Sequence, residues 1–235
     1  MIIAQQSEPA ATPAHTHVLE SIKDLARRAS IETSARNLIE IDAYPSLLPL
    51  GTDVYVAWIP GSPYHHVVSV AKRLQRVGMN PVPRIAARQL ANREVATEYL
   101  ASLRDEADVR RALIIAGDSD APVGAYDSSA ALLESGLLQA HGIRSVGIAG
   151  YPEGHPKIPE AALMAALDRK IDYAAAHGLD LFMVTQFCFD GQTILGWLER
   201  LRARGVILPV RVGVAGPATI RTLLKYGVRC GIGNS

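Results

Sequence analysis

Ionisable side chains stand at the ends of two apolar runs, where a protein can present them to a ligand. Glu32 lies in the run SIET, and a carboxylic acid among apolar walls can serve as a general acid. An ordinary surface or ion-paired glutamate is the alternative. Asp118 follows Gly117 at the end of ALIIAGD, where a charge needs water, a ligand or a partner. A Gly-Asp pair is also common in turns, so by itself it is a weak signal.

The string GYPEGHP, at residues 150–156, combines an aromatic ring, a carboxylate, an imidazole and two prolines. We expect Tyr151 to stack on a planar ligand and His155 to bond a phosphate or a ring carbonyl. The alternative is a rigid loop between prolines, in which these two side chains only cover the end of the fold.

A further apolar run ends in TQFCFD, at residues 185–190. The Gln186 side chain has both a donor and an acceptor, which suit the edge of an amide-like heterocycle, and Phe187 and Phe189 would supply apolar walls. A buried glutamine that satisfies backbone groups is the alternative. Cys188 stands between the two aromatic residues and is expected to be a small core residue rather than a nucleophile.

Candidates for binding phosphate or metal are few. Arg169 and Lys170 lie on a predicted helix, from which cationic side chains could reach a phosphate. A solvated helix face is the default interpretation of such a pair. No H-x-x-H, H-E-x-x-H or carboxylate cluster occurs in the sequence, so no metal site is predicted.

Apolar runs rich in β-branched residues alternate with amphipathic segments along the chain, which predicts strands and helices in turn. Such continuous apolar strands indicate a parallel sheet that is buried on both faces. The predicted strands are residues 30–33, 54–58, 81–86, 112–116, 145–149, 181–185 and 209–214. The predicted helices are residues 65–78, 93–107, 128–142, 160–178 and 191–205. Four of these helices end in a glycine that can close them in a left-handed conformation: Gly78, Gly142, Gly178 and Gly205.

A barrel and a doubly wound sheet share this pattern. The barrel is favoured because the repeat is regular, because no G-x-G-x-x-G follows the first strand, and because polar residues follow several strands. A complete (β/α)8 TIM-type barrel has eight strands and typically ~250 residues. This chain of 235 residues shows no clear eighth strand. The expected fold is therefore an α/β TIM-type barrel that is truncated before the eighth strand.

The composition is that of a globular chain, with 49% hydrophobic residues and a formal net charge of +1. Balanced charge without a basic tract gives no reason to bind nucleic acid, and no apolar run reaches the ~20 residues that span a membrane.

Residues 1–17 are predicted to be a flexible tail and residues 18–235 a single barrel domain. Two cysteines, Cys188 and Cys230, are too few for a disulfide framework, so a reducing cytoplasm is expected.

Four strings in one order, IIAGD, GYPEGHP, LDRKID and TQFCFD, resemble the methylenetetrahydrofolate reductase family over about residues 112–216. The resemblance implies a (β/α)8 barrel that holds FAD at the carboxyl ends of its strands. Such enzymes serve one-carbon metabolism and methionine biosynthesis. They reduce 5,10-methylenetetrahydrofolate to 5-methyltetrahydrofolate with electrons from NADH or NADPH.

The resemblance also implies roles for individual residues. Glu32 would be the acid that assists opening of the folate's five-membered ring, and Asp118 would contact the pterin and the flavin. Gln186 would contact folate and nicotinamide in turn, with Phe187 beside it in the substrate site. The implied cofactor-binding residues are Gly117, Asp118, Tyr126, Tyr151, His155, Arg169 and Lys170.

The chain departs from the family's pattern in four places. Ala116 replaces an arginine, Arg84 replaces a histidine, residues 33–36 replace an aromatic and proline run, and Ile220-Arg221 replaces a folate-packing aromatic. Two alternatives to the reductase follow: a relative that binds folate without flavin, and a truncated paralogue without catalysis. Because an unclosed barrel exposes strand edges, a homo-oligomer is expected.

Overall fold

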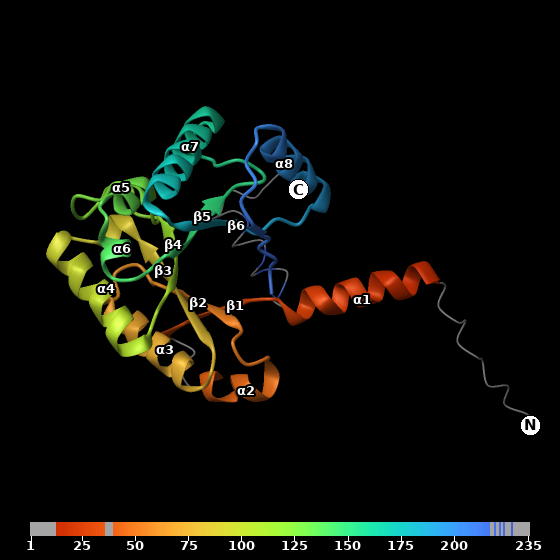
Figure 1. The fold of residues 1–235 in the computed structure, drawn as a ribbon, viewed down its shortest axis with the longest axis horizontal. Coiled ribbons are helices and arrows are strands. Elements are labelled where there is room, and N and C mark those ends of the chain that lie inside the picture. Colours follow the sequence, from red (N-terminus) through yellow and green to blue (C-terminus); the bar gives the residue numbers. More distant parts are fainter. Residues whose placement is uncertain are drawn as a thin grey trace, which may run out of the picture.

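The computed structural model describes residues 13–35 and 40–216, together with residues 219, 221, 223 and 227. Seven strands form one sheet in which all neighbours are parallel and the spatial order follows the sequence. The sheet curls into an open barrel with helices on its outer side (Figure 1). The strands are β1 (Ile31–Ser34), β2 (Asp53–Ala57), β3 (Asn80–Ala86), β4 (Arg111–Ile115), β5 (Ser145–Gly150), β6 (Asp180–Thr185) and β7 (Val210–Arg211).

Helices connect the strands because parallel neighbours need a crossover from the end of one strand to the start of the next. The crossovers contain η2 (Glu40–Ala43), α2 (Tyr44–Leu47), α3 (His65–Arg76), η3 (Ala87–Gln89), α4 (Arg93–Ala107), α5 (Ser129–Glu134), α6 (Leu137–Ala140), α7 (Glu160–His177) and α8 (Gly191–Ala203). A further helix, α1 (Pro13–Arg27), precedes β1 and extends away from the barrel (Figure 1).

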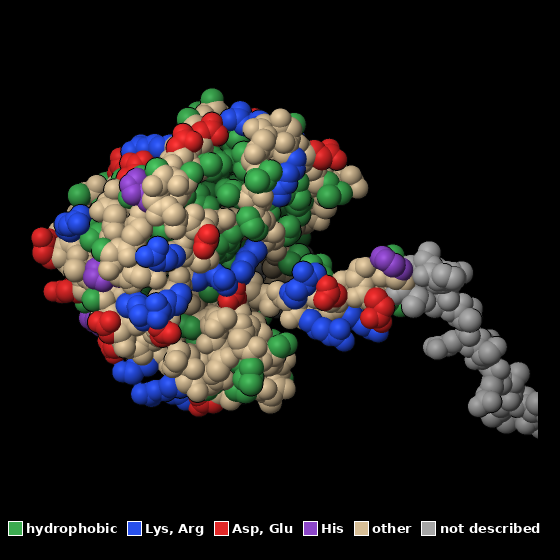
Figure 2. Space-filling view, viewed as in Figure 1, with side chains coloured by type: hydrophobic (Ala, Val, Ile, Leu, Met, Phe, Trp, Pro, Cys, Tyr) green, Lys and Arg blue, Asp and Glu red, His purple; other side chains and the backbone are tan. Residues whose placement is uncertain are grey.

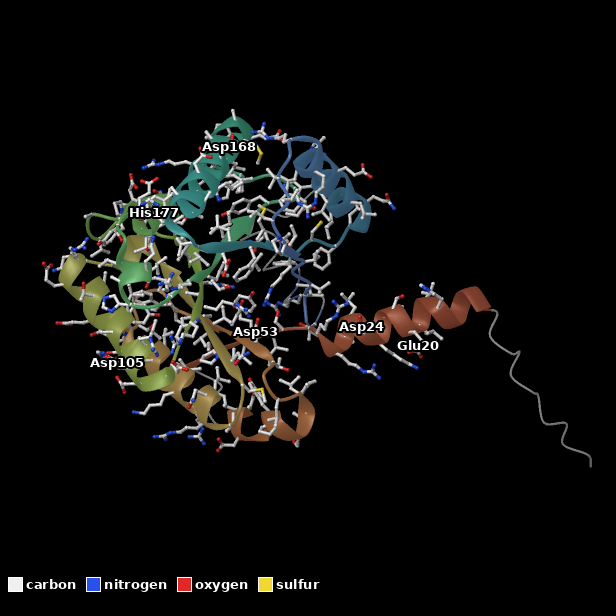
Figure 3. The ribbon with its side chains drawn as sticks, in the orientation of Figure 1. Glu20, Asp24, Asp53, Asp105, Asp168 and His177 are labelled. Atoms are coloured by element: carbon white, nitrogen blue, oxygen red, sulfur yellow. The ribbon has the colours of Figure 1, made fainter. Side chains whose placement is uncertain are left out.

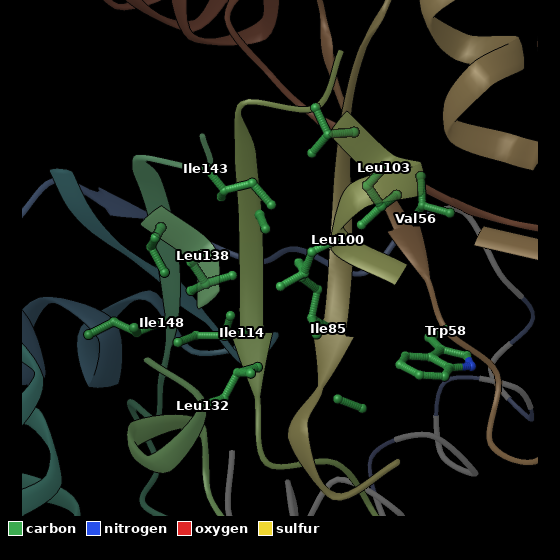
Figure 4. Packing of buried hydrophobic residues seen from close by; sticks show 14 of the residues in the cluster. Val56, Trp58, Ile85, Leu100, Leu103, Ile114, Leu132, Leu138, Ile143 and Ile148 are labelled. Atoms are coloured by element: carbon green, nitrogen blue, oxygen red, sulfur yellow. The ribbon is translucent and has the colours of Figure 1, made fainter. Parts of the chain in front are cut away.

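The two faces of the sheet carry different cores, because successive residues of a strand point to opposite sides. Val56, Ile85 and Ile114 point outward and belong to the large core together with Leu100 and Leu132 of the helices (Figure 4). The barrel interior holds a smaller apolar cluster, which consists of Tyr55, Val82, Leu113 and Phe182.

Two arginines share one carboxylate inside the barrel, that of Asp53, which is labelled in Figure 3. Asp53 Oδ2 accepts hydrogen bonds from Arg111 Nη1 and, at 2.6 Å, from Arg211 Nη1, and the Asp53 side chain is only 11% exposed. Arg211 Nη1 also donates to the Tyr55 hydroxyl at 3.2 Å, and both guanidinium groups lie near the Phe182 ring. Since Asp53 begins β2 and Arg211 ends β7, the cluster connects two strands that are not neighbours in the sheet.

The expected α/β barrel that lacks an eighth strand is confirmed over the described residues. Each of the seven predicted strands occurs, although β7 is only Val210 and Arg211 rather than residues 209–214. In the described part of the chain, no helix is both long and apolar enough to cross a membrane.

The helix predicted over residues 128–142 is in fact two helices, α5 and α6. The Ser135 hydroxyl donates to the Leu132 carbonyl and accepts from the Leu137 N–H, and Gly136 has a φ of +74°. This local turn ends the first helix. The four predicted terminal glycines all have positive φ: Gly78, Gly142, Gly178 and Gly205.

Helix α1 was not predicted, and its first residues overlap the predicted tail of residues 1–17. Residues 1–12 lie outside the described residues, as do Cys230, Arg36 and Ile220. The division into a tail and a barrel domain therefore stays a prediction.

Because two arginines share the Asp53 carboxylate, we expect the substitution Asp53→Asn to lower the stability of the fold strongly. Loss of its charge leaves two partly buried guanidinium groups without a counter-charge, and we expect the free energy of unfolding to fall by about 3 kcal/mol. Urea denaturation measures this change. Asp105→Asn, at an exposed position of α4, removes the same charge and should change stability by less than about 0.5 kcal/mol. Equal effects of the two substitutions would contradict the role of Asp53.

Candidate active site

The loops that follow β4, β5 and β6 are joined to one another at the carboxyl ends of the strands. Lys157 Nζ, after β5, lies 2.8 Å from Asp120 Oδ1, after β4. The Gln186 N–H, after β6, donates to the Gly150 carbonyl at the end of β5 at 2.8 Å. Three of the predicted site strings therefore meet at one edge of the sheet, where the ligands of α/β barrels bind.

The end of β4 places Asp118 beside Tyr151. Gly117 has a φ of +100°, and a Cβ there would lie 3.2 Å from the Ala86 Cβ, so glycine lets the chain turn close to β3. Burial raises the pKa of Tyr151, and the negative charge of Asp118 raises it further. The turn thus brings a carboxylate near a half-buried phenol.

His155 is held as a neutral imidazole at the surface of the same loop. Its ring lies edge-on to Tyr151 with the centroids 5.1 Å apart, and its Nδ1 accepts the Lys157 backbone N–H at 3.1 Å. Burial lowers the pKa of His155, and the Lys157 charge lowers it further. At neutral pH the ring proton is therefore on Nε2, which can donate to an acceptor of a ligand.

The segment after β6 forms an apolar side of the site. The rings of Phe187 and Phe189 are 5.6 Å apart and nearly perpendicular, while Cys188 is buried. Burial raises the pKa of the Cys188 thiol and the neighbouring Glu153 carboxylate adds to this, so the thiol is the protonated, unreactive form. This agrees with its expected place as a small core residue.

Glu153 was not singled out from the sequence, although it stands in the middle of GYPEGHP. Its Oε2 is buried and has no hydrogen-bond partner among the described residues. Its proximity to Cys188 connects the loop after β5 with the segment after β6. The motif itself was the available signal, but nothing in the sequence distinguished Glu153 from a solvated glutamate.

Glu32 forms an ion pair with Arg84 inside the barrel. The pair joins Oε2 of Glu32 on β1 with Nη2 of Arg84 on β3. Glu32 is in register with Tyr55, a member of the interior cluster, so it faces inward as predicted. The Arg84 Nε is buried and has no partner among the described residues. Glu32 is therefore ion-paired in this structure, and its role as an acid stays a prediction.

Two of the predicted cofactor-binding residues, Arg169 and Tyr126, contact other parts of the protein. Arg169 forms two contacts with the Glu134 carboxylate of α5, and this partner raises the pKa of Arg169. Tyr126 is buried in the large core.

Lys170 is half-buried, and burial lowers its pKa. It makes no hydrogen bond or ion pair within the described part of the chain.

Metal ligands do not gather in this region. Within residues 13–35 and 40–216, no three His, Cys, Asp or Glu side chains lie close enough together to hold a metal ion.

The fold is similar to that of a solved protein from Coccidioides immitis assigned as a deoxyribose-phosphate aldolase. The TM-score is 0.51 at 13% identity, over 88% of this chain and 78% of that chain. At this identity the similarity concerns the fold alone, and it agrees with a TIM-type barrel.

Three curated relatives are similar in sequence. A 5,10-methylenetetrahydrofolate reductase from Pectobacterium carotovorum subsp. carotovorum is 28% identical over 166 residues, which are 69% of this chain and 51% of the relative. Methylenetetrahydrofolate reductase 2 of Saccharomyces cerevisiae is 30% identical over 34% of this chain and 13% of its own. Methylenetetrahydrofolate reductase 1 of Schizosaccharomyces pombe is 34% identical over 29% of this chain and 11% of its own.

The match thus spans about half the length of the bacterial relative and a smaller share of the two yeast proteins. The family model described as methylenetetrahydrofolate reductase matches residues 30–227, which include every strand of the barrel and the whole candidate site. On this evidence the chain belongs to the methylenetetrahydrofolate reductase family.

Proposed function

We propose that this chain reduces 5,10-methylenetetrahydrofolate to 5-methyltetrahydrofolate with FAD and with NADH or NADPH. The observation that carries the proposal is the meeting of Asp118, Tyr151 and Gln186 at the ends of three adjacent strands. These side chains offer a carboxylate, an aromatic ring and an amide, which together suit a pterin or a flavin ring. Family membership supports the same substrate.

The residues present fit FAD in part. Tyr151 offers a ring for stacking, His155 Nε2 offers a donor, and Lys170 is a half-buried amine that lacks an anionic partner among the described residues. We propose that these three residues hold the flavin, with Lys170 near its phosphates. When bound, FAD would supply the hydride transfer between the nicotinamide and the folate. Arg169, which pairs with Glu134, is not needed for this arrangement.

Glu32 is proposed as the acid for the folate. Arg84 Nη2 donates to its Oε2, which leaves Oε1 as the oxygen that carries a proton to the substrate. The ion pair with Arg84 and the role of acid compete, because an ion-paired Glu32 is an ionised carboxylate whereas a general acid must hold a proton. We infer that Arg84 positions Glu32 and that the pair loosens when folate enters.

A relative that binds folate without flavin is the second candidate. Two observations favour it: Arg84, in place of the family's histidine, is engaged with Glu32, and Arg169 is engaged with Glu134. Both side chains would otherwise be available to a cofactor. A reducing cytoplasm and a place in methionine biosynthesis stay predictions for either candidate.

The visible absorption spectrum of the purified chain tests the proposal directly. We expect a flavin band, either at once or after FAD is added, that bleaches with NADH or NADPH and returns with methylenetetrahydrofolate. A colourless protein that takes up no FAD but binds folate would support the second candidate. A chain that binds neither would contradict both and leave the non-catalytic paralogue.

The substitution Glu32→Gln separates the two half-reactions. Reduction of the flavin by the nicotinamide needs no acid at Glu32, so its rate should be unchanged, whereas transfer to the folate should slow at least ~100-fold. Stopped-flow measurement of flavin absorbance follows both steps. Glu199→Gln, at an exposed position of α8, is the matched control and should change neither rate. Equal loss of both half-reactions in Glu32→Gln would remove Glu32 from the role of acid.

The substitution Gln186→Ala tests recognition of the pterin edge. The backbone hydrogen bond to Gly150 is retained, but polar groups of the folate lose their partner, so binding should weaken by roughly 1 to 3 kcal/mol. Isothermal titration with folate measures the change. Gln75→Ala, at an exposed position in the last turn of α3 beside the amino end of β3, removes an identical amide away from the site and should leave the affinity unchanged. An unchanged affinity in Gln186→Ala would exclude this residue from the site.

A further inference from the structure

The segment that carries Asp118 is a long loop. Residues 116–128 join β4 to α5 without forming a helix or a strand, and loops of this length in compact folds are usually functional. Because the loop belongs to no helix or sheet, its backbone carbonyls need hydrogen-bond donors from elsewhere. Arg88 supplies several of these hydrogen bonds from η3, which directly follows β3 at the carboxyl end of that strand.

The Arg88 side chain bonds two carbonyls of this loop. Its Nε donates to the Asp127 carbonyl at 2.7 Å, and its Nη1 donates to the Ser119 carbonyl at 2.9 Å. A guanidinium group is a rigid fork of donors and can bond acceptors that are distant in sequence, whereas the ammonium group of lysine is a single point charge. The Arg88 side chain therefore connects the beginning of the loop with its end.

The backbone of Arg88 bonds the same loop. Its N–H donates to the Ala116 carbonyl, and its carbonyl accepts the Val123 N–H, both at 2.9 Å. Asp118 lies between Ala116 and Ser119, whose carbonyls both accept a hydrogen bond from Arg88. The backbone on each side of Asp118 is thus attached to one residue at the end of the neighbouring strand.

Two other contacts of the loop differ in how firmly they hold it. A Cβ at Gly124 would lie 1.9 Å from the Ala91 carbonyl oxygen, so the loop backbone packs directly on the segment after η3. The ion pair between Asp120 and Lys157 is exposed to water on both sides. Acidic and basic side chains are interspersed over the surface in Figure 2, and exposed pairs of this kind contribute little to stability. The loop is therefore held mainly from the side of Arg88.

We propose that Arg88 is a positioning residue, which holds the loop of residues 116–128 so that the Asp118 carboxylate meets the ligand. Both of its side-chain hydrogen bonds go to carbonyls of the loop, so Arg88 acts through Asp118 and not on the ligand itself. The inference rests on the proposed function, in which Asp118 contacts the pterin. Arg88 was not singled out from the sequence, because its role depends on loop carbonyls that no motif records.

Isothermal titration with 5-methyltetrahydrofolate, in the presence of FAD, tests this role. Arg88→Met keeps the length of the side chain but loses its donors, so we expect the Kd to rise about tenfold. Arg88→Lys keeps the charge without the fork and should not restore the affinity. A wild-type affinity in Arg88→Lys would show that the charge alone matters and would overturn the proposal.

Arg202→Met is the matched control. The Arg202 side chain also donates to two backbone carbonyls, those of Val206 and Leu208, in the loop that leads to the amino end of β7. Its loss removes the same kind of contact at the opposite end of the barrel, so the affinity for 5-methyltetrahydrofolate should remain that of the wild type. A similar loss of affinity in both variants would indicate general loosening of the fold and would contradict a specific role of Arg88.

A double-mutant cycle shows whether Arg88 acts through Asp118. Residues that act through one another have effects that do not add, whereas independent effects do. In the background of Asp118→Asn, the further change Arg88→Met should therefore raise the Kd by less than about twofold. The same fold-change in both backgrounds would mean that Arg88 affects the ligand independently of Asp118, and the proposal would fail.

Hydrogen exchange of the ligand-free chain separates this proposal from the proposed function. The amides of residues 117–127 should exchange about tenfold faster in Arg88→Met, while those of β3 and β4 keep their protection. Unchanged exchange in the loop would overturn the role of Arg88. A wild-type chain that does not bind 5-methyltetrahydrofolate would contradict the proposed function, and exchange alone would then decide whether Arg88 holds the loop.

Discussion

The alternation of side chains along seven parallel strands is the constraint on which the rest of the structure depends. Each strand has to satisfy two environments, since one face meets the helices and the other meets the barrel interior. Because every crossover returns to the same end of the sheet, all carboxyl ends lie along one edge. Residues as far apart as Asp118 and Gln186 are thereby brought to the same region without any direct sequence signal between them.

The elements that could be predicted are those with a strong local pattern. Apolar runs located all seven strands, and positive φ at Gly78 and Gly178 agrees with the predicted helix ends. Two features of the helices could not be predicted in this way. A side-chain hydrogen bond of Ser135 divides one amphipathic segment into two helices, and periodicity does not detect such competition with the backbone. Helix α1 carries Val18, Leu19, Ile22 and Leu25 at helical spacing, but it was not predicted as a helix, and only its first residues overlap the predicted tail of residues 1–17.

The candidate site was predictable where neighbouring strands meet, and not elsewhere. Asp118 and Tyr151 follow adjacent strands, so their proximity follows from the topology once a parallel sheet is assumed. The Glu32–Arg84 pair crosses over β2, and only the curvature of the barrel brings these two side chains together. The direction of Arg169 depends on how α7 packs beside α5, because a helix has more than one exposed side. The spacing of residues in the sequence does not predict which side of a helix packs against its neighbour.

The bond between Arg211 and Asp53 has a consequence for the order of folding, since its partners are 158 positions apart in the chain. Closing a loop of this length costs about 4 to 5 kcal/mol of chain entropy, and contacts so distant form late. During synthesis Asp53 and Arg111 leave the ribosome long before Arg211 does. Until then the barrel interior is open and one of its carboxylates has only half of its final counter-charge, so the nascent chain passes through a stage in which its inner apolar surface is exposed to chaperones or to aggregation.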